Sequence, residues 1–176
     1  MDINQLVNIT SRAWSLPILA SLHNGVPGRQ APLLAATGAG RSSFALSMDH
    51  LIEIGLLERN PGYGHPLRPE FRLTEEGIRA AALAHDVKGN GGRLVLRKAW
   101  TVPVLATLQE PRPFGGIKAG LGSITDRALS QSLKSLEGEG WVERRIDPAL
   151  RPVRPIYGAI NAGHEIAQSI APHLSA

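Results

Sequence analysis

The chain has 176 residues, of which 43% are hydrophobic and 19% are charged. This length permits one medium domain or two small ones, and the composition is that of a folded protein and excludes a disordered chain. Cysteine is absent, which excludes disulfides, thiolate zinc sites and thiol redox switches. The six histidines form no close pair at metal-ligand spacing, so we expect no metal and no other cofactor.

The formal net charge is +4 and the sequence pI is about 10.0. Residues 1–88 hold eight basic and eight acidic side chains, so the whole basic excess lies in residues 89–176. A mild basic excess fits a nucleic-acid partner without establishing one. The longest apolar runs are too short to span a bilayer, and the N-terminus lacks the basic flank of a signal peptide. We therefore expect a cytoplasmic protein that has no membrane partner and is nucleoid-associated if it binds DNA.

Two ten-residue segments of the chain are near copies of each other. The segment "AWSLPILASL" begins at Ala13 and "AWTVPVLATL" begins at Ala99, with six identical positions. Similar loops, turns and Pro-rich stretches follow both segments in the same order. The glycine-rich "KGNGG" between the two stretches is a natural linker. The sequence therefore predicts a tandem repeat, with one domain at 1–88 and the other at 89–176.

The first helix of each predicted repeat starts at the near-copied segment. Ser15 and Thr101 stand where a side-chain oxygen caps a helix. Pro17 and Pro103 then fall in the first turn, where a missing N–H carries no penalty. Apolar residues follow at helical spacing, so we expect the helix to be a packing element in each repeat.

A later helix of each repeat ends at a glycine, Gly55 or Gly140. In the second repeat, Thr125 is the expected cap, and Asp126 in the first turn favours the helix dipole. Apolar residues at helical spacing predict one buried stripe in each copy. The stripes are Phe44, Met48 and Leu51 in the first repeat and Leu129, Leu133 and Leu136 in the second.

Two short strands and a last helix complete each repeat. The strands are expected at 56–59 and 70–73, and at 141–144 and 156–159. Thr74 is placed to cap the last helix of the first repeat. The order helix, helix, helix, hairpin, helix is that of a winged helix. The predicted fold is mainly α with small β-hairpins (α+β), as two tandem winged helix-turn-helix domains arranged as a pseudo-dimer.

Several motifs of the second repeat resemble the HxlR family of winged-helix regulators, which is close to the MarR-type regulators. They are "KAWTVPVL", "RPFGGI", "ITDRALSQSLKSLE" and "GWVER", which begin at Lys98, Arg112, Ile124 and Gly140. The first repeat matches less closely, although "FRLTEEG" at 71–77 fits the strand-to-helix junction of the family. The resemblance implies a DNA-binding transcriptional regulator. Family members typically carry one such domain and form homodimers on operator DNA, whereas this chain carries two.

In a winged helix the third helix enters the major groove, where its exposed side chains meet base edges and phosphates. Polar side chains at the expected outward positions of the second repeat suit this role. Gln131 is suited to pair with adenine, and Arg127 is suited to pair with guanine or a phosphate. Arginines on the hairpin suit the backbone or a narrow minor groove. The candidate DNA-binding residues here are Thr125, Asp126, Arg127, Ser130, Gln131, Lys134, Arg144, Arg145, Arg151 and Arg154.

The first repeat has a different chemistry at the corresponding positions. Ala45, Leu46 and Asp49 stand where the second repeat has Ser130, Gln131 and Lys134. A carboxylate repels phosphates and the two apolar side chains offer no hydrogen bonds, so we expect a poor base reader. Candidates for backbone contact remain in this repeat; they are Arg41, Ser42, Ser43 and Arg68, with Arg59 and Arg72 in the same hairpin region. Leu46 is either exposed, and then suited to a protein contact or self-association, or part of the core.

Two functions follow from these patterns. The first is a sequence-specific regulator that binds double-stranded DNA mainly through the second repeat. The alternative is a tandem winged-helix module for protein interaction, replication, chromosome partitioning or small-molecule binding, with weak or no DNA binding. An effector near Trp14 and Trp100 is conceivable, although core packing explains both tryptophans better. Ser47, Asp49 and His50 are helix neighbours without triad geometry, so we expect no enzyme.

Overall fold

A computed structural model describes residues 1–62, 69–89, 94–147 and 154–175. The first part of the chain is mostly helical. It contains α1 (Ile3–Thr10), α2 (Ser15–His23), α3 (Gln30–Thr37), α4 (Arg41–Glu53), β1 (Leu57–Arg59), β2 (Phe71–Leu73) and α5 (Glu75–Gly89). The second part contains η1 (Leu94–Arg97), α6 (Thr101–Thr107), β3 (Arg112–Pro113), α7 (Phe114–Leu121), α8 (Asp126–Gly138), β4 (Val142–Asp147), β5 (Arg154–Ala159), α9 (Asn161–Ile170) and η2 (Ala171–His173).

The strands form two small antiparallel sheets. Strand β1 pairs with β2, and β5 lies between β3 and β4 in a three-stranded sheet. The first half has a single bridge, Arg29 to Glu70, in the place that β3 takes in the second half. These elements confirm a mainly helical fold with small hairpins. Among the described helices, none has the length and apolarity needed to cross a membrane.

The near-copied segments have the same local structure. Trp14 and Trp100 are the residues before α2 and α6, with φ, ψ of −106°, 0° and −99°, −6°. The predicted caps at Ser15 and Thr101 are wrong, because both residues lie inside their helices. Their backbone N–H groups donate to the carbonyls of Arg12 and Lys98, at 3.2 and 3.1 Å, so a preceding turn takes the place of a side-chain cap.

The junction between hairpin and last helix is also built alike in both halves. A side chain of the junction donates to a glycine carbonyl: Thr74 Oγ1 to Gly55 at 2.7 Å, and Asn161 Nδ2 to Gly140 at 2.9 Å. Both of these glycines have positive φ, at 74° and 70°, as expected for residues that end a helix. Thr74 also accepts a hydrogen bond from the N–H of Gly77 at 3.0 Å, which confirms it as a cap.

Glycine is required one turn into each last helix. A Cβ at Gly77 would lie 2.0 Å from the carbonyl oxygen of Leu56, and one at Gly163 would lie 2.2 Å from that of Trp141. Backbone atoms are involved in both cases, so a small side-chain adjustment cannot relieve the overlap. The glycines therefore let α5 and α9 lie directly against the backbone at Leu56 and Trp141, just before β1 and β4.

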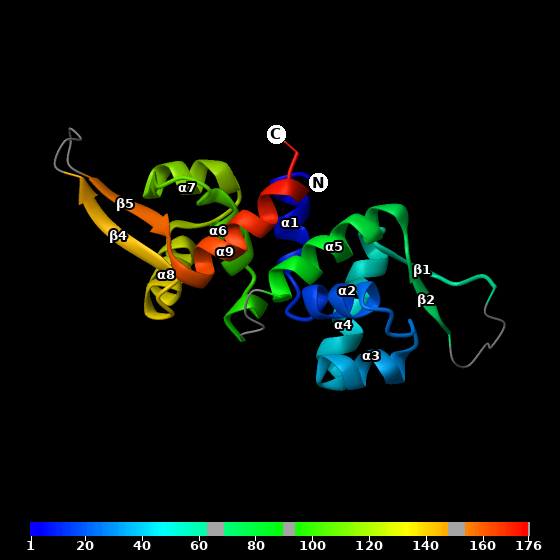
Figure 1. Cartoon of the computed structure of the whole chain (residues 1–176). Helices are drawn as coiled ribbons and strands as arrows, with labels where there is room; N and C mark the ends of the chain where they lie inside the picture. The colour runs from blue at the N-terminus through cyan, green and yellow to red at the C-terminus, as the bar shows by residue number, and fades with distance from the viewer. Residues whose placement is uncertain (63–68, 90–93, 148–153, 176) are drawn as a thin grey trace.

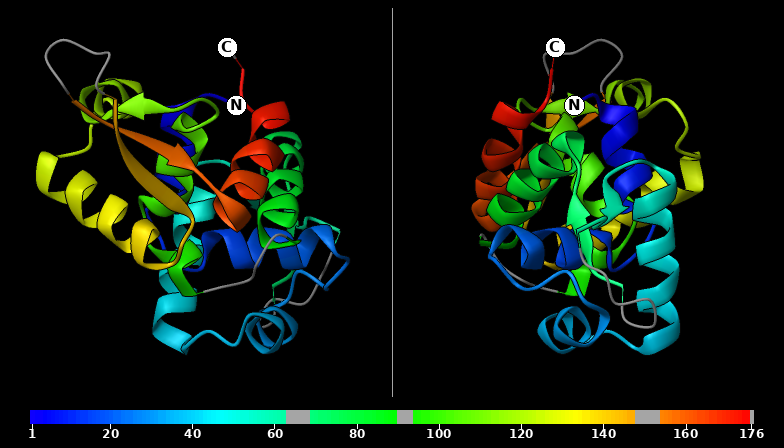
Figure 2. Two further views of the ribbon diagram at one scale, coloured as in Figure 1. Left: turned by 60° about the vertical axis from the view of Figure 1, so that its left-hand side comes forward. Right: turned by 90° about the vertical axis from the view of Figure 1, so that its right-hand side faces the viewer.

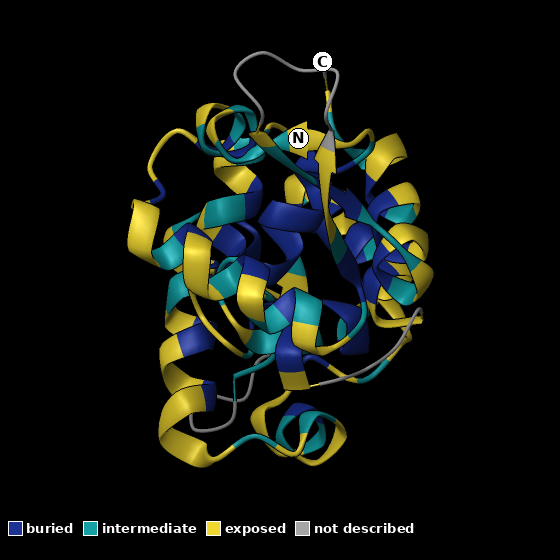
Figure 3. Ribbon diagram, turned by 90° about the vertical axis from the view of Figure 1, so that its left-hand side faces the viewer, coloured by how far each residue is buried: buried dark blue, intermediate teal, exposed yellow. Residues whose placement is uncertain are grey.

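The two halves share one continuous core. Helix α5 packs on both α2 and α9, and α1 packs on α2, α6 and α7. The two hairpins point to opposite ends of the molecule, and the buried segments gather where the central helices meet (Figures 1 and 3). Figure 2 shows from two further sides that the chain ends lie close together. The Met1 ammonium donates to the His173 carbonyl at 3.1 Å.

Helix α1 was not predicted from the sequence. It is held by a capping box, in which the Asp2 side chain accepts from the Gln5 N–H at 2.8 Å and Gln5 Oε1 accepts from the Asp2 N–H at 3.0 Å. Leu6 and Ile9 on its inner face are buried. The spacing of Asp2 and Gln5 is the signal that sequence reading missed.

Candidate nucleic-acid interface

Helix α8 presents one buried and one exposed face, as its sequence pattern predicts. Thr125 Oγ1 accepts a hydrogen bond from the Ala128 N–H at 3.2 Å, so the predicted cap is confirmed. The leucine stripe of this helix is buried. The exposed face is entirely polar and consists of Asp126, Arg127, Ser130, Gln131 and Lys134. Burial of the stripe therefore fixes which side chains α8 offers to a partner.

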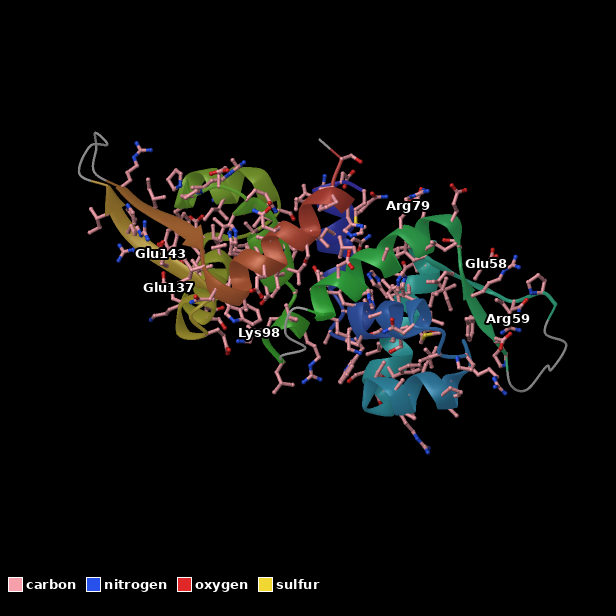
Figure 4. All side chains as sticks on the ribbon, in the orientation of Figure 1. Glu58, Arg59, Arg79, Lys98, Glu137 and Glu143 are labelled. Carbon is pink, nitrogen blue, oxygen red and sulfur yellow. The ribbon has the colours of Figure 1, made fainter. Side chains whose placement is uncertain are left out.

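The charges on this face are unevenly paired. Asp126 Oδ1 lies 2.6 Å from Nζ of Lys118 on α7, so its negative charge is partly neutralised. Within the described residues, neither Arg127 nor Lys134 has a carboxylate in ion-pair range. Lys98 Nζ donates to Ser135 Oγ at 2.7 Å and ties η1 to α8; Figure 4 shows Lys98 beside this helix. Sequence reading missed both lysines, because no local spacing links them to α8.

The hairpin formed by β4 and β5 adds arginines beside α8. Arg144 pairs with Tyr157 across the ladder, and Arg145 pairs with Ile156. Because side chains alternate between the faces of a strand, Arg144 lies on one face, while Arg145 and Arg154 lie on the other. Arg145 Nη2 lies 2.6 Å from Glu143 Oε1. The predicted wing arginines therefore do not form a single cluster. Arg151 lies outside the described residues.

Helix α4 has the same buried stripe as α8 but a different surface. Phe44, Met48 and Leu51 are buried, as predicted. Ala45 and Asp49 are exposed, and 55% of Leu46 is exposed, so Leu46 is not part of the core. The helix begins after Gly40 without a side-chain cap. The predicted backbone-contact residues at its start are all exposed; they are Arg41, Ser42 and Ser43.

Two of the described arginines near the first hairpin, Arg72 and Arg29, are paired with carboxylates. Arg72 Nε donates to Glu58 Oε1 at 2.6 Å across β1 and β2, and Arg29 Nε lies 3.9 Å from Glu70 Oε1. Arg59 is exposed beside them on β1, where Figure 4 shows it next to Glu58. The predicted Arg68 lies outside the described residues. Among the described residues, this end of the molecule therefore offers less free positive charge than the α8 end.

Arg79 on α5 is paired in the same way. The Arg79 guanidinium donates hydrogen bonds to the carboxylates of Glu76 and Glu75, the latter at 3.1 Å, and these bonds raise its pKa. The group is charged at all physiological pH values, so this cluster adds no pH dependence to the surface.

Two polar residues of α4, Ser47 and His50, are held in structural contacts. The Ser47 hydroxyl donates to the Ser43 carbonyl at 3.0 Å, and His50 Nε2 lies 2.8 Å from the Asn8 carbonyl oxygen. His50 therefore links α4 to α1 and is not hydrogen-bonded to Ser47. In the ranges that the structure describes, no three acidic or histidine side chains gather as a metal site.

Both tryptophans of the near-copied segments are half-buried and pack against the core. This position fits the packing role that the apolar context of Trp14 and Trp100 predicts. The guanidinium of Arg97 lies over the Trp14 ring, with Cζ 4.4 Å from the ring centroid. Such a contact is a cation–π interaction.

Comparison with known proteins identifies the second half. Residues 95–174 match the family model described as HxlR-like helix-turn-helix. The chain is 28% identical to the transcriptional regulator YodB from B. subtilis, solved in its reduced form; the match covers 44% of this chain and 76% of YodB, with a TM-score of 0.40. None of the curated proteins compared with the chain matches it. The matched range contains α8, β4 and β5, and the chain therefore carries an HxlR-like helix-turn-helix domain at residues 95–174.

Proposed function

We propose that the protein is a sequence-specific transcriptional regulator that binds double-stranded DNA through its second half. The observation that carries this proposal is the face of α8, which belongs to the HxlR-like domain and exposes only polar side chains. Arg127 and Lys134, which have no carboxylate in ion-pair range among the described residues, suit the phosphate backbone, which supplies much of the affinity of any DNA-binding protein.

In this proposal α8 lies in the major groove. Gln131 pairs with adenine N6 and N7, and Arg127 pairs with guanine or a phosphate. Ser130 and Lys134 contact phosphates and fix the register of the helix. The ion pair with Lys118 keeps the Asp126 carboxylate from repelling the DNA.

The hairpin of β4 and β5 contacts the backbone or the adjacent minor groove. Because side chains alternate between the two faces of the hairpin, only one face can contact the DNA at a given point. The face with Arg145 and Arg154 carries two exposed arginines, of which Arg145 is paired with Glu143, whereas the other face carries Arg144 beside the exposed Ile146. We assign DNA contact to the two-arginine face.

In the same proposal, the first half of the chain is also a winged helix. The two halves together form a pseudo-dimer. Support comes from the shared element order, the matching tryptophan turns and the matching strand-to-helix junctions. The domain boundaries proposed are 1–88 and 89–176. The α4 face offers DNA one carboxylate and two apolar side chains, so this half supports the fold without reading bases.

Selection from a random DNA pool tests the proposal. The full chain is used to enrich a 30-base-pair library, and the affinity for the enriched duplex is measured at several salt concentrations. Arg127→Ala with Lys134→Ala should abolish specific binding and reduce the salt slope by about two, one for each lost phosphate contact. Failure to enrich any motif, or full affinity in the double variant, contradicts the assignment.

A protein-interaction module is the second candidate, and the exposure of Leu46 favours it. In that case the partner covers α4, and DNA contact is weak or absent. The same selection separates the two functions. A motif bound equally well by wild type and by Leu46→Ser supports the regulator, whereas no motif together with a partner that is lost in Leu46→Ser supports the module.

A further inference from the structure

A pocket of about 360 Å³ opens where the two halves of the chain meet. The first half supplies residues of α2, α5 and the end of α3, and the second supplies residues of η1. This volume is within the range of about 300–1,000 Å³ that small-molecule sites occupy. No residue of the proposed DNA-binding face lines the pocket. The lining residues used below are Trp14, Leu16, Val87, Lys88, Leu94 and Arg97.

The walls of the pocket are apolar. Leu16, Val87 and Leu96 are almost completely buried, and Trp14 adds an aromatic face. Leu94 stands apart, because 72% of it is exposed. An exposed leucine at the edge of an apolar pocket extends that surface toward the solvent. Such walls favour a flat hydrocarbon body over a sugar or a phosphate ester.

The charged groups of the pocket have one sign. Among the described residues, Lys88 and Arg97 are the only ionisable ones that line the pocket, and neither has a described carboxylate in ion-pair range. The Arg97 guanidinium is held over the Trp14 ring at 4.4 Å, so its orientation is already set. A guanidinium fixed in this way binds a carboxylate through two parallel hydrogen bonds at little cost in side-chain entropy.

We propose that this pocket binds a small aromatic carboxylate. The ring system packs between Trp14 and the aliphatic walls, and the carboxylate meets Arg97 with Lys88 nearby. The pocket is also connected to the proposed DNA-binding face. Arg97, which lines the pocket, is followed directly by Lys98, and Lys98 donates a hydrogen bond to Ser135 of α8. A ligand that shifts η1 therefore shifts a support of α8.

Tryptophan resonances give a direct test with the full chain and without DNA. The ¹⁵N-labelled protein is titrated with 2-naphthoate, and the indole N–H signals of its three tryptophans are followed. Loss of one signal in Trp14→Phe identifies Trp14. We expect the Trp14 signal to move most and to saturate with a Kd of about 1 mM or tighter, while Trp100 and Trp141 move less. Because no DNA is present, failure here is independent of the proposed regulator function.

Charge variants separate this pocket from non-specific binding. Arg97→Gln should weaken 2-naphthoate binding by about tenfold or more, since a charge-assisted pair is lost. Leu94→Glu, at an exposed position that tolerates substitution, should weaken it similarly by placing a carboxylate at the edge. Arg12→Gln removes an exposed arginine that does not line the pocket and should leave binding unchanged.

Three results would overturn the proposal. The first is absence of saturable binding. The second is equal binding of the neutral 2-naphthalenemethanol, which would remove the role of the cations. The third is wild-type affinity in Leu94→Glu, a variant whose fold is checked by its circular dichroism spectrum and melting temperature.

Discussion

Helices α4 and α8 are alike inside and different outside. Each buries three apolar residues at the same spacing, and each starts after a short turn. On the exposed face, Ala45, Leu46 and Asp49 of α4 contrast with a fully polar set on α8. Packing constrains the buried stripe closely, whereas exposed positions are free to change with function. Similar cores therefore say little about which helix reads DNA.

The hairpins repeat this contrast. Strands β1 and β2 are three residues each, and Arg72 is held by Glu58. Strands β4 and β5 are six residues each and carry exposed arginines on both faces. The second hairpin reaches farther from the core. Although Arg145 is paired with Glu143, Arg144 and Arg154 have no carboxylate in ion-pair range among the described residues. Both differences agree with the proposal that the second half binds DNA.

The largest expected effect comes from giving α8 the face of α4. The variant Ser130→Ala, Gln131→Leu, Lys134→Asp should lose specific DNA affinity by about 100-fold or more, because a base contact contributes about 1–3 kcal/mol and a cation becomes an anion. All three positions are exposed, so the melting temperature should stay near that of wild type. Fluorescence anisotropy on the selected duplex measures the loss. A folded variant with undiminished specificity is incompatible with reading by α8.

The strand-to-helix junctions should respond equally in the two halves. Gly77→Ala and Gly163→Ala should each lower the free energy of unfolding by about 1–3 kcal/mol, since the new methyl overlaps a backbone carbonyl. Gly138→Ala is the matched control. It meets no atom within 4 Å and ends a helix, so it should raise stability by about 0.5–1 kcal/mol. Urea unfolding measures all three, and wild-type stability in either junction variant speaks against this packing.

A reciprocal transplant should give α4 a moderate affinity for DNA. Ala45→Ser, Leu46→Gln, Asp49→Lys removes one repulsive charge and adds one phosphate contact. The salt slope of non-specific binding should steepen by about one, and affinity at low salt should rise by up to about tenfold. Titrations of a random-sequence duplex at a series of salt concentrations measure both. An unchanged slope indicates that α4 does not face the DNA.

The smallest effect is expected for Asp49→Ala. Removal of this carboxylate should not weaken DNA binding and should strengthen it by at most about threefold, because one exposed charge is well screened at physiological salt. Asp126→Ala is the matching change on α8. It also removes an exposed carboxylate, but in addition it releases Lys118 from its ion pair. A clear loss of affinity in Asp49→Ala is evidence that α4 takes part in recognition.

The sequence predicted those features that depend on local patterns. The leucine stripe, the Thr125 cap and the glycines that end helices all follow from spacing along one element. Helix α1 was missed although its capping box is local, because it lies before the near-copied tryptophan segment from which the predicted repeat starts. The caps at Ser15 and Thr101 were misjudged since the preceding turn, which satisfies their N–H groups, has no distinctive sequence.

Contacts between distant elements could not be predicted in this way. The pair of Lys118 and Asp126, the bond from Lys98 to Ser135 and the contact of Arg97 with Trp14 join different helices. Each depends on how the helices cross, which periodicity does not encode. The same holds for the division of the wing arginines between two faces, since the strand register decides it.

The symmetry of the DNA motif selected from a random pool tests the central claim most directly. If α8 alone reads bases, the motif has one cluster of specified base pairs and no symmetric partner. If α4 reads as well, a second cluster lies about one helical turn, or 10–10.5 base pairs, from the first. We predict the single cluster, and a two-part motif whose second part disappears in Arg41→Ala, Ser42→Ala would contradict the account.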